Sequence, residues 1–233
     1  MQFSISIHKP GKSMSLIRTL SILAVIGFAY SEDRARGYWD LRATIGSYPG
    51  VEDAKYKYDD NSPDSNDKWD TSAGSLDIFA SHRFESVTAH GGFITFGLFS
   101  RGASGESKAE SDVEIEHSAA GIIVGGGYSF VPTSWYSLEI GPRLGLGVSV
   151  ANESGFGLKL KSDTGGYASI DFQVSNNFNV TEKFQLSANI GFAGWSSTND
   201  YPAKDTGAGY FPGGEAEYSG SGVYFSIGAG ISL

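Results

Sequence analysis

The chain of 233 residues contains no cysteine. Disulfide bridges, thiolate catalysis and cysteine-ligated metal sites are therefore excluded together. Charge is also scarce, since Asp, Glu, Lys and Arg make up 18% of the residues, and basic groups are the scarcer kind, with 17 against 26 acidic ones. The resulting net charge of −9 argues against a nucleic-acid partner, because the phosphates of DNA and RNA bind to basic surfaces.

Long apolar runs are nearly absent as well. The one that stands out covers residues 20–29, follows three basic residues and precedes the first acidic residue, Glu32. It is about half as long as the ~20 residues that a membrane-spanning helix needs. We therefore expect residues 1–31 to be a signal peptide cleaved after Ser31, with an N-terminal anchor as the alternative and Met14 as an alternative start. Residues 32–233 are then expected to form one domain.

The main pattern in this domain is a recurring alternation of apolar and polar residues. It is clearest in 136–150, where Tyr136, Leu138 and Ile140 begin a row of every second residue that continues to Val150. Such a period of two indicates strands. Eight segments show it: 39–48, 75–84, 90–100, 119–130, 136–150, 168–174, 184–192 and 223–233. Just before 119–130 the phase reverses, since Ile115 is odd-numbered and Ile122 even-numbered, which predicts either a bulge or the end of a membrane zone.

The connections between these segments alternate in length. Residues 49–74, 101–118, 151–165 and 194–222 are long, whereas 85–89, 131–135 and 179–183 are short. Transmembrane β-barrels have short turns on the periplasmic side and longer extracellular loops. The sequence therefore predicts an all-β, antiparallel, up-and-down transmembrane β-barrel of about eight strands, with both termini in the periplasm. A soluble secreted β-barrel that binds an apolar ligand is the alternative, and its apolar faces would point inward.

Aromatic residues gather near the expected strand ends. On the short-turn side they are Trp39, Tyr128, Phe130, Trp135, Tyr136, Phe178 and Phe184, and on the long-connection side Tyr48, Trp195 and Tyr218. Two interfacial girdles are expected from this distribution.

The last twelve residues, Gly222-Val-Tyr-Phe-Ser-Ile-Gly-Ala-Gly-Ile-Ser-Leu233, resemble the closing strand of small bacterial outer-membrane β-barrel proteins of the OmpA/OmpX type. The resemblance covers 39–233 at the level of pattern, and 138–145 shares it. It implies a place in the outer membrane, contact with outer-membrane lipid and insertion by the outer-membrane assembly machinery. Closing strands of that family usually end in an aromatic residue, whereas this one ends in Leu233. No periplasmic domain is expected after it. The family includes adhesins, structural proteins and lipid-modifying enzymes, so the resemblance predicts a fold more than an activity.

Charged residues on the expected inner face form the main candidate site. They are Asp40, Arg42, Asp77, Arg83, Glu139, Arg143 and Asp171. Because an eight-stranded barrel is only wide enough to be filled by side chains, we expect these groups to pair and plug the lumen. A narrow ion path lined by the same groups is the alternative, and the chain is too short for a wide porin channel.

One group of residues suggests a hydrolase. His117 and Ser118 lie beside Glu114 and Glu116, and outer-membrane lipid A deacylases use a histidine, a serine and an acid. In a strand, however, neighbouring side chains point to opposite faces, so His117 and Ser118 could share a proton only across a bulge. A solvated charge cluster is the simpler interpretation. His82 and His90 are expected at the periplasmic interface.

The first long connection is rich in carboxylates, with Glu52, Asp53, Asp59, Asp60, Asp64, Asp67 and Asp70. Oxygen ligands suit Ca²⁺, but residues 59–67 lack the glycine and the terminal glutamate of an EF-hand loop. We expect a solvated acidic segment, and no catalytic, cofactor or metal residue is assigned. The favoured function is a non-enzymatic outer-membrane barrel with a side-chain-plugged lumen and a structural or surface-interaction role through its long extracellular loops, its extracellular ligand unspecified. An outer-leaflet lipid-modifying enzyme is the second hypothesis.

Overall fold

The computed structural model describes residues 38–60, 62–84, 90–110, 112–155, 158–205 and 210–233. The expected signal peptide lies outside them. The chain forms strands β1 (Tyr38–Ser47), β2 (Asp53–Tyr58), β3 (Ser65–Arg83), β4 (Gly91–Ser107), β5 (Glu114–Thr133), β6 (Tyr136–Gly155), β7 (Leu158–Lys161), β8 (Gly165–Asn179), β9 (Phe184–Tyr201), β10 (Lys204–Asp205), β11 (Tyr210–Phe211) and β12 (Gly214–Ser232). Within the described residues, no helix is both long and apolar enough to cross a membrane.

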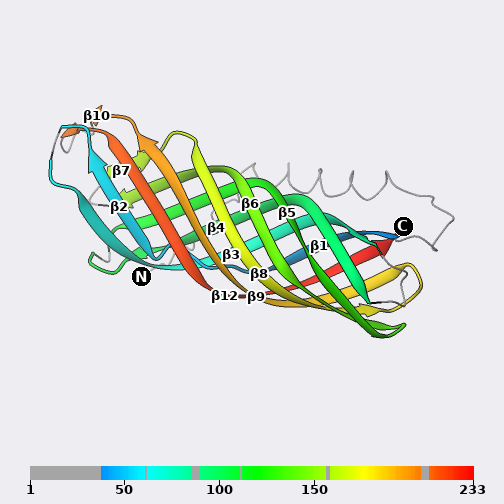
Figure 1. The fold of residues 1–233 in the computed structure, drawn as a ribbon. Coiled ribbons are helices and arrows are strands. Elements are labelled where there is room, and N and C mark those ends of the chain that lie inside the picture. Colours follow the sequence, from blue (N-terminus) through cyan, green and yellow to red (C-terminus); the bar gives the residue numbers. More distant parts are fainter. Residues whose placement is uncertain (1–37, 61, 85–89, 111, 156–157, 206–209) are drawn as a thin grey trace, which may run out of the picture.

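The strands close into a ring in which every pairing is antiparallel (Figure 1). In the described part of the chain the ring has eight positions, taken in order by β1, β3, β4, β5, β6, β8, β9 and β12. β1 pairs with both β3 and β12, which closes the sheet. β2 continues β1, because it pairs with the same two neighbours in unbroken register. The predicted all-β barrel of about eight strands is confirmed.

The barrel is long, and its two ends differ. The C-terminus, the end of β3 and the short turns after β5 and β8 lie at one end, and the short strands β2, β7 and β10 lie at the other (Figure 1). We call the half next to the C-terminus the proximal half and the other the distal half. The boundary crosses the strands near Ser47, Gly74, Ser100, Ala119, Val150, Gly166, Gly194 and Gly222.

The outer surface of the proximal half is apolar. Outward side chains there include Leu98, Leu146 and Ile170, each about 60% exposed to solvent in the isolated chain. On β9 the outward apolar row runs from Phe184 to Phe192, which matches the 9–11 residues of a strand that crosses the hydrocarbon core. An apolar surface of this extent around the whole barrel is unstable in water. The proximal half is therefore a transmembrane barrel, and the soluble alternative is wrong for it.

In the distal half the polarity of the wall reverses. Outward positions on β4 and β5 become polar, as at Ser104, Glu106 and Glu116, while inward positions become apolar. Ile115 is 1% exposed and Trp69 2%. The core cluster gathers in this half and at its boundary. The distal half is thus built like a water-soluble barrel, polar outside and apolar inside, and stands clear of the hydrocarbon core.

This reversal explains where the sequence-based boundaries differ from the structure. The residues expected as long connections mostly continue the strands: β4 runs to Ser107, β5 starts at Glu114 and β9 runs to Tyr201. The phase change between Ile115 and Ile122 is the end of the membrane zone, because β5 keeps one register against β6 from Glu114 to Phe130. At this boundary the apolar residues move from the outward face of each strand to the inward face, while the strand itself continues. The strand ends expected from the apolar periodicity therefore fall too early.

Candidate functional site

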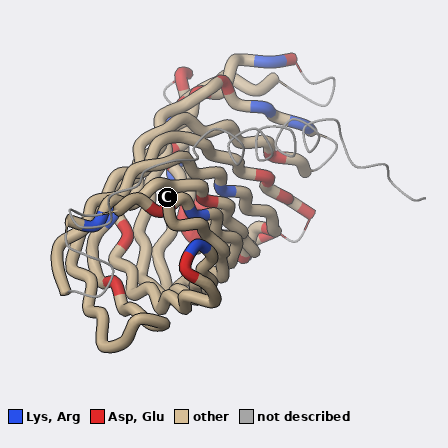
Figure 2. The backbone as a smooth tube through the Cα atoms, turned by 90° about the vertical axis from the view of Figure 1, so that its right-hand side faces the viewer, with Lys and Arg blue, Asp and Glu red and all other residues tan. Residues whose placement is uncertain are grey.

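The structure places all seven predicted lumen charges on the inner face of the proximal half. None is more than 8% exposed. The alternation that directs apolar residues to lipid directs every second residue of each strand to the lumen. In Figure 2, which views the barrel from the C-terminal end, coloured charged segments appear on several of the strands that surround the lumen. The seven side chains sort into two layers, and an eighth charged residue, Arg101, joins them.

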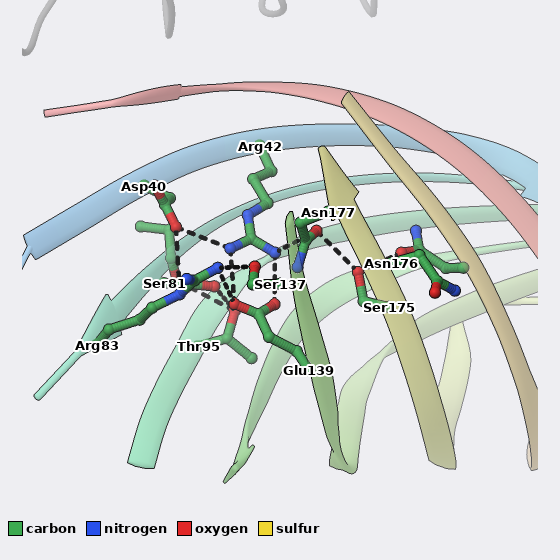
Figure 3. Close-up of polar contacts among 12 residues, drawn as sticks. Asp40, Arg42, Ser81, Arg83, Thr95, Ser137, Glu139, Ser175, Asn176 and Asn177 are labelled. Carbon is green, nitrogen blue, oxygen red and sulfur yellow. Dashed lines mark hydrogen bonds and ion pairs between the residues drawn. The ribbon is translucent and has the colours of Figure 1, made fainter. Parts of the chain in front are cut away.

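The first layer lies nearer the C-terminal end and contains Asp40, Arg42, Arg83 and Glu139. Arg42 donates to both oxygens of Glu139, at 2.5 and 2.9 Å, and to Asp40 at 2.7 Å. Arg83 Nη2 lies 2.5 Å from Glu139 Oε1. Figure 3 shows the two arginines from β1 and β3 pointing at the carboxylate of Glu139 on β6. The ion pairs therefore cross the lumen and join strands that are not neighbours in the ring.

The second layer contains Asp77, Arg101, Arg143 and Asp171. Arg101 donates to Asp77, and Arg143 contacts Asp77 at 3.5 Å and Asp171 at 3.0 Å.

Two tyrosines complete the second layer. Tyr48 donates to Asp171 at 2.8 Å, and Arg143 donates to the hydroxyl of Tyr224 at 2.9 Å. Arg101 was missed because the strand was expected to end at Ser100. Arg101 has an odd residue number, as do Phe93 and Phe99, whose side chains face inward on the same strand. This shared parity was the sequence signal that could have identified Arg101 as a lumen residue.

Each layer holds two arginines and two acids, so each is neutral overall. Buried ions of this kind are tolerated when every charge has a partner. Between the layers lies a cavity of about 20 Å³ lined in part by Arg42, Glu139, Arg143 and Gln173, which is room for about one water molecule. The side chains of the two layers meet across the lumen of the proximal half.

Above the second layer, at the boundary and in the distal half, the lumen is filled by aromatic rings. His117 stacks on Trp195 with ring centroids 5.0 Å apart, and Trp195 stacks on Tyr167 at 5.6 Å. Tyr218 packs against His117 at 5.7 Å. Trp195 is anchored further by donating to the carbonyl oxygen of Pro49 at 2.9 Å. These rings pack against one another in the distal lumen.

The predicted girdle on the long-connection side is therefore wrong. Tyr48, Trp195 and Tyr218 are buried in the lumen, because each has the inward parity of its strand. Of the girdle expected on the short-turn side, Trp39, Tyr128, Phe130, Trp135, Phe178 and Phe184 are exposed, and Tyr136 is partly exposed. Phe84, which was not predicted, is exposed there too. His82 packs against Trp39 with tilted rings and His90 stacks on Phe130, so both histidines lie among these rings.

The hydrolase grouping does not assemble. His117 is 3% exposed and faces the lumen, whereas Ser118 faces outward. The hydroxyl partner of His117 is Ser197 on β9, at 2.9 Å from Nε2. Burial among aromatic rings lowers the pKa of His117 to about 4, so the ring is neutral at physiological pH. The expectation of a solvated cluster is corrected for His117, which belongs to the aromatic packing, while Glu114 and Glu116 are exposed as expected.

A single carboxylate in the distal lumen collects three tyrosine hydroxyls. Glu153 of β6 accepts at Oε1 from Tyr56 at 2.8 Å, from Tyr201 at 3.3 Å and from Tyr218. The tyrosines come from β2, β9 and β12. Despite three donors, burial raises the pKa of Glu153 above its ordinary value. Sequence reasoning missed this cluster, because 151–165 was expected to be a loop.

The acidic segment 52–70 folds into the β2–β3 hairpin. Lys68 pairs with Asp53 at 2.9 Å, and Lys68 and Asp53 are largely exposed. Among the described residues no group of three or more His, Asp or Glu side chains is arranged to hold a metal ion.

No protein-family model and no curated protein matches the chain. Solved structures of outer-membrane proteins are similar to it in fold. The outer membrane protein OprG from Pseudomonas aeruginosa aligns over 85% of this chain and 96% of its own, with 10% identity and a TM-score of 0.49. Ail, the attachment invasion locus protein of Yersinia pestis, aligns over 85% and 99%, with 15% identity and a TM-score of 0.41. The outer membrane protease OmpT from Escherichia coli aligns over 89% and 99%, with 8% identity and a TM-score of 0.49.

Proposed function

We propose that the chain is a non-enzymatic β-barrel of the bacterial outer membrane that serves envelope integrity or surface contact, with a lumen closed by its own side chains. The observation that carries this proposal is the reversal of wall polarity between the two halves. It supports a barrel that sits in lipid with one half and projects a rigid, water-exposed wall with the other. Single-chain barrels of this kind belong to outer membranes, and their shorter turns face the periplasm.

Three successive layers of packing support the proposed closed lumen. The first layer joins β1 and β3 to β6, the second joins β3, β4, β6 and β8, and the aromatic rings fill the distal end. A conducting path would have to break buried ion pairs, each of which costs several kcal/mol when one partner is left alone. These contacts favour the plugged lumen over the narrow ion path.

The distal wall is the surface available for contact with other molecules. On it, Asp70, Glu106 and Glu114 stand directly opposite one another on β3, β4 and β5, and we call them the acidic row. On β2 and β12 the charges alternate instead, with Lys55 opposite Glu217. Like charges in direct cross-strand pairs lower stability. The acidic row therefore supports a surface role more than a role in stabilising the barrel.

Membrane location and closure are tested separately. The full chain, expressed in a Gram-negative host, should be recovered with the outer-membrane fraction and should migrate faster on SDS gels before heating than after. Recovery from the soluble periplasm would overturn the proposal. Purified barrel added to planar lipid bilayers should give no steady conductance, and a stable ohmic current would overturn the closed lumen while leaving the membrane location intact.

Envelope integrity and surface contact are then separated in the native host. Loss of the chain should raise sensitivity to detergents and bile-like amphiphiles if the barrel supports the envelope. Unchanged sensitivity would leave surface contact through the distal wall as the role.

A further inference from the structure

The Glu153 cluster is the feature of the molecule that neither the membrane barrel nor the closed lumen uses. The carboxylate extends from β6, while its three tyrosine donors come from β2, β9 and β12 on other parts of the ring. Tyr201 and Tyr218 are also hydrogen-bonded to each other, with their oxygens 2.6 Å apart. The cluster therefore ties several parts of the distal wall together through one oxygen atom.

Among the described residues, no cation is paired with Glu153. Across from it on β5 is Ile115, which is 1% exposed, and across from it on β7 is Leu160. Asp67 of β3 adds a second negative charge nearby, and the described residues show no lysine or arginine paired with Glu153. The remaining titratable ring, His117 of β5, reaches the cluster only through its stacking on Tyr218 and is neutral above pH 5.

We propose that the Glu153 cluster makes the distal half sensitive to pH, holding β2 and β12 more tightly when Glu153 is protonated than when it is ionised. Glu153 is partly buried. An ionised carboxylate that is partly buried without a cation loses solvation, which phenol donors replace only in part. A protonated carboxyl can still accept from tyrosines at its carbonyl oxygen and carries no charge. Mild acid thus tightens the distal wall, and neutral pH loosens it.

The sign of the effect follows from proton linkage. Because burial raises the pKa of Glu153 in the folded barrel, the folded form binds the proton more tightly than the unfolded chain does. The stabilisation is fully present below the unfolded pKa and is lost as pH rises through the folded pKa. His117 acts in the opposite sense, since its lowered pKa favours the neutral form.

The test is amide hydrogen exchange of β2 and β12 in the full-length barrel in detergent micelles, corrected for intrinsic rates, between pH 5 and pH 8. Glu153→Gln keeps the shape and the acceptor and removes the charge. Its matched control is Glu116→Gln, which removes the same charge from the outer wall, opposite Asn152, the residue next to Glu153. Since both proteins keep His117, their difference isolates Glu153.

At pH 8, β2 and β12 should exchange more slowly in Glu153→Gln than in Glu116→Gln, by about tenfold for each unit by which the pKa is raised. At pH 5 the difference should be smaller than at pH 8. Equal or faster exchange in Glu153→Gln at pH 8, or a difference that does not depend on pH, would overturn the proposal.

A second pair of variants covers the case in which Glu153→Gln fails to fold. Tyr56→Phe removes one donor to the carboxylate, so the ionised form loses support and the midpoint of the pH dependence should move to higher pH. Tyr58→Phe is its control, because Tyr58 lies on the same strand and its hydroxyl bonds to Ser65 instead. Identical midpoints in the two variants would contradict the proposal.

Discussion

Neutralising Glu139 tests most directly whether the first charge layer stabilises the barrel. Three hydrogen bonds or ion-pair contacts of 2.5 to 2.9 Å join this carboxylate to Arg42 and Arg83, and the residue is 4% exposed. Glu139→Gln leaves two buried guanidinium groups with Asp40 as the remaining acid of the layer. Breaking a buried ion pair from one side costs about 3–5 kcal/mol. We therefore expect the equilibrium constant for unfolding to rise by roughly two to four orders of magnitude.

The assay is equilibrium unfolding by urea in detergent micelles, followed by the fluorescence of the four tryptophans. Glu116→Gln is the control, because it removes an exposed carboxylate and should change the free energy of unfolding by less than about 0.5 kcal/mol. Replacing Arg42 and Glu139 together, by Met and Leu, should recover part of the loss, since it removes both members of a pair. A free energy of unfolding for Glu139→Gln within about 1 kcal/mol of the wild type would refute the reasoning.

Three further predictions concern the distal half and the boundary of the membrane. Because the pKa of His117 is lowered to about 4, stability should fall on the order of 3 kcal/mol as pH drops from 6.5 to 4, and urea titrations of His117→Gln should lack this part of the loss. Leu146→Arg, on the lipid face, should destabilise the barrel in lipid vesicles by about 2–4 kcal/mol, whereas Ser104→Arg on the distal wall should change stability by less than about 0.5 kcal/mol; equal effects would contradict the boundary. Glu106→Lys turns both like-charge contacts of the acidic row into opposite-charge pairs, and thermal unfolding should show a gain of about 0.4–2 kcal/mol at low salt that shrinks at high salt.

Much of the proximal half could be predicted from the sequence, because there each side chain faces one of two solvents. Residues such as Leu146 and Arg143 differ so strongly in polarity that the alternation of 136–150 already separates lipid from lumen. The ring of eight strands and the inward direction of the seven predicted charges depend on this local rule alone.

The distal half required the tertiary structure. Its strands keep the same alternation but exchange the polar and apolar faces, so the reversal at Ile115 had two local explanations, and only the continuous register of β5 against β6 decides between them. Pairing across the lumen is not local either. Arg42 meets Glu139, His117 meets Ser197, and Glu153 meets tyrosines from three strands, over separations of 48 to 97 residues. The sequence by itself determines which face of a strand a residue takes, and the curvature of the closed barrel determines which partner it meets there.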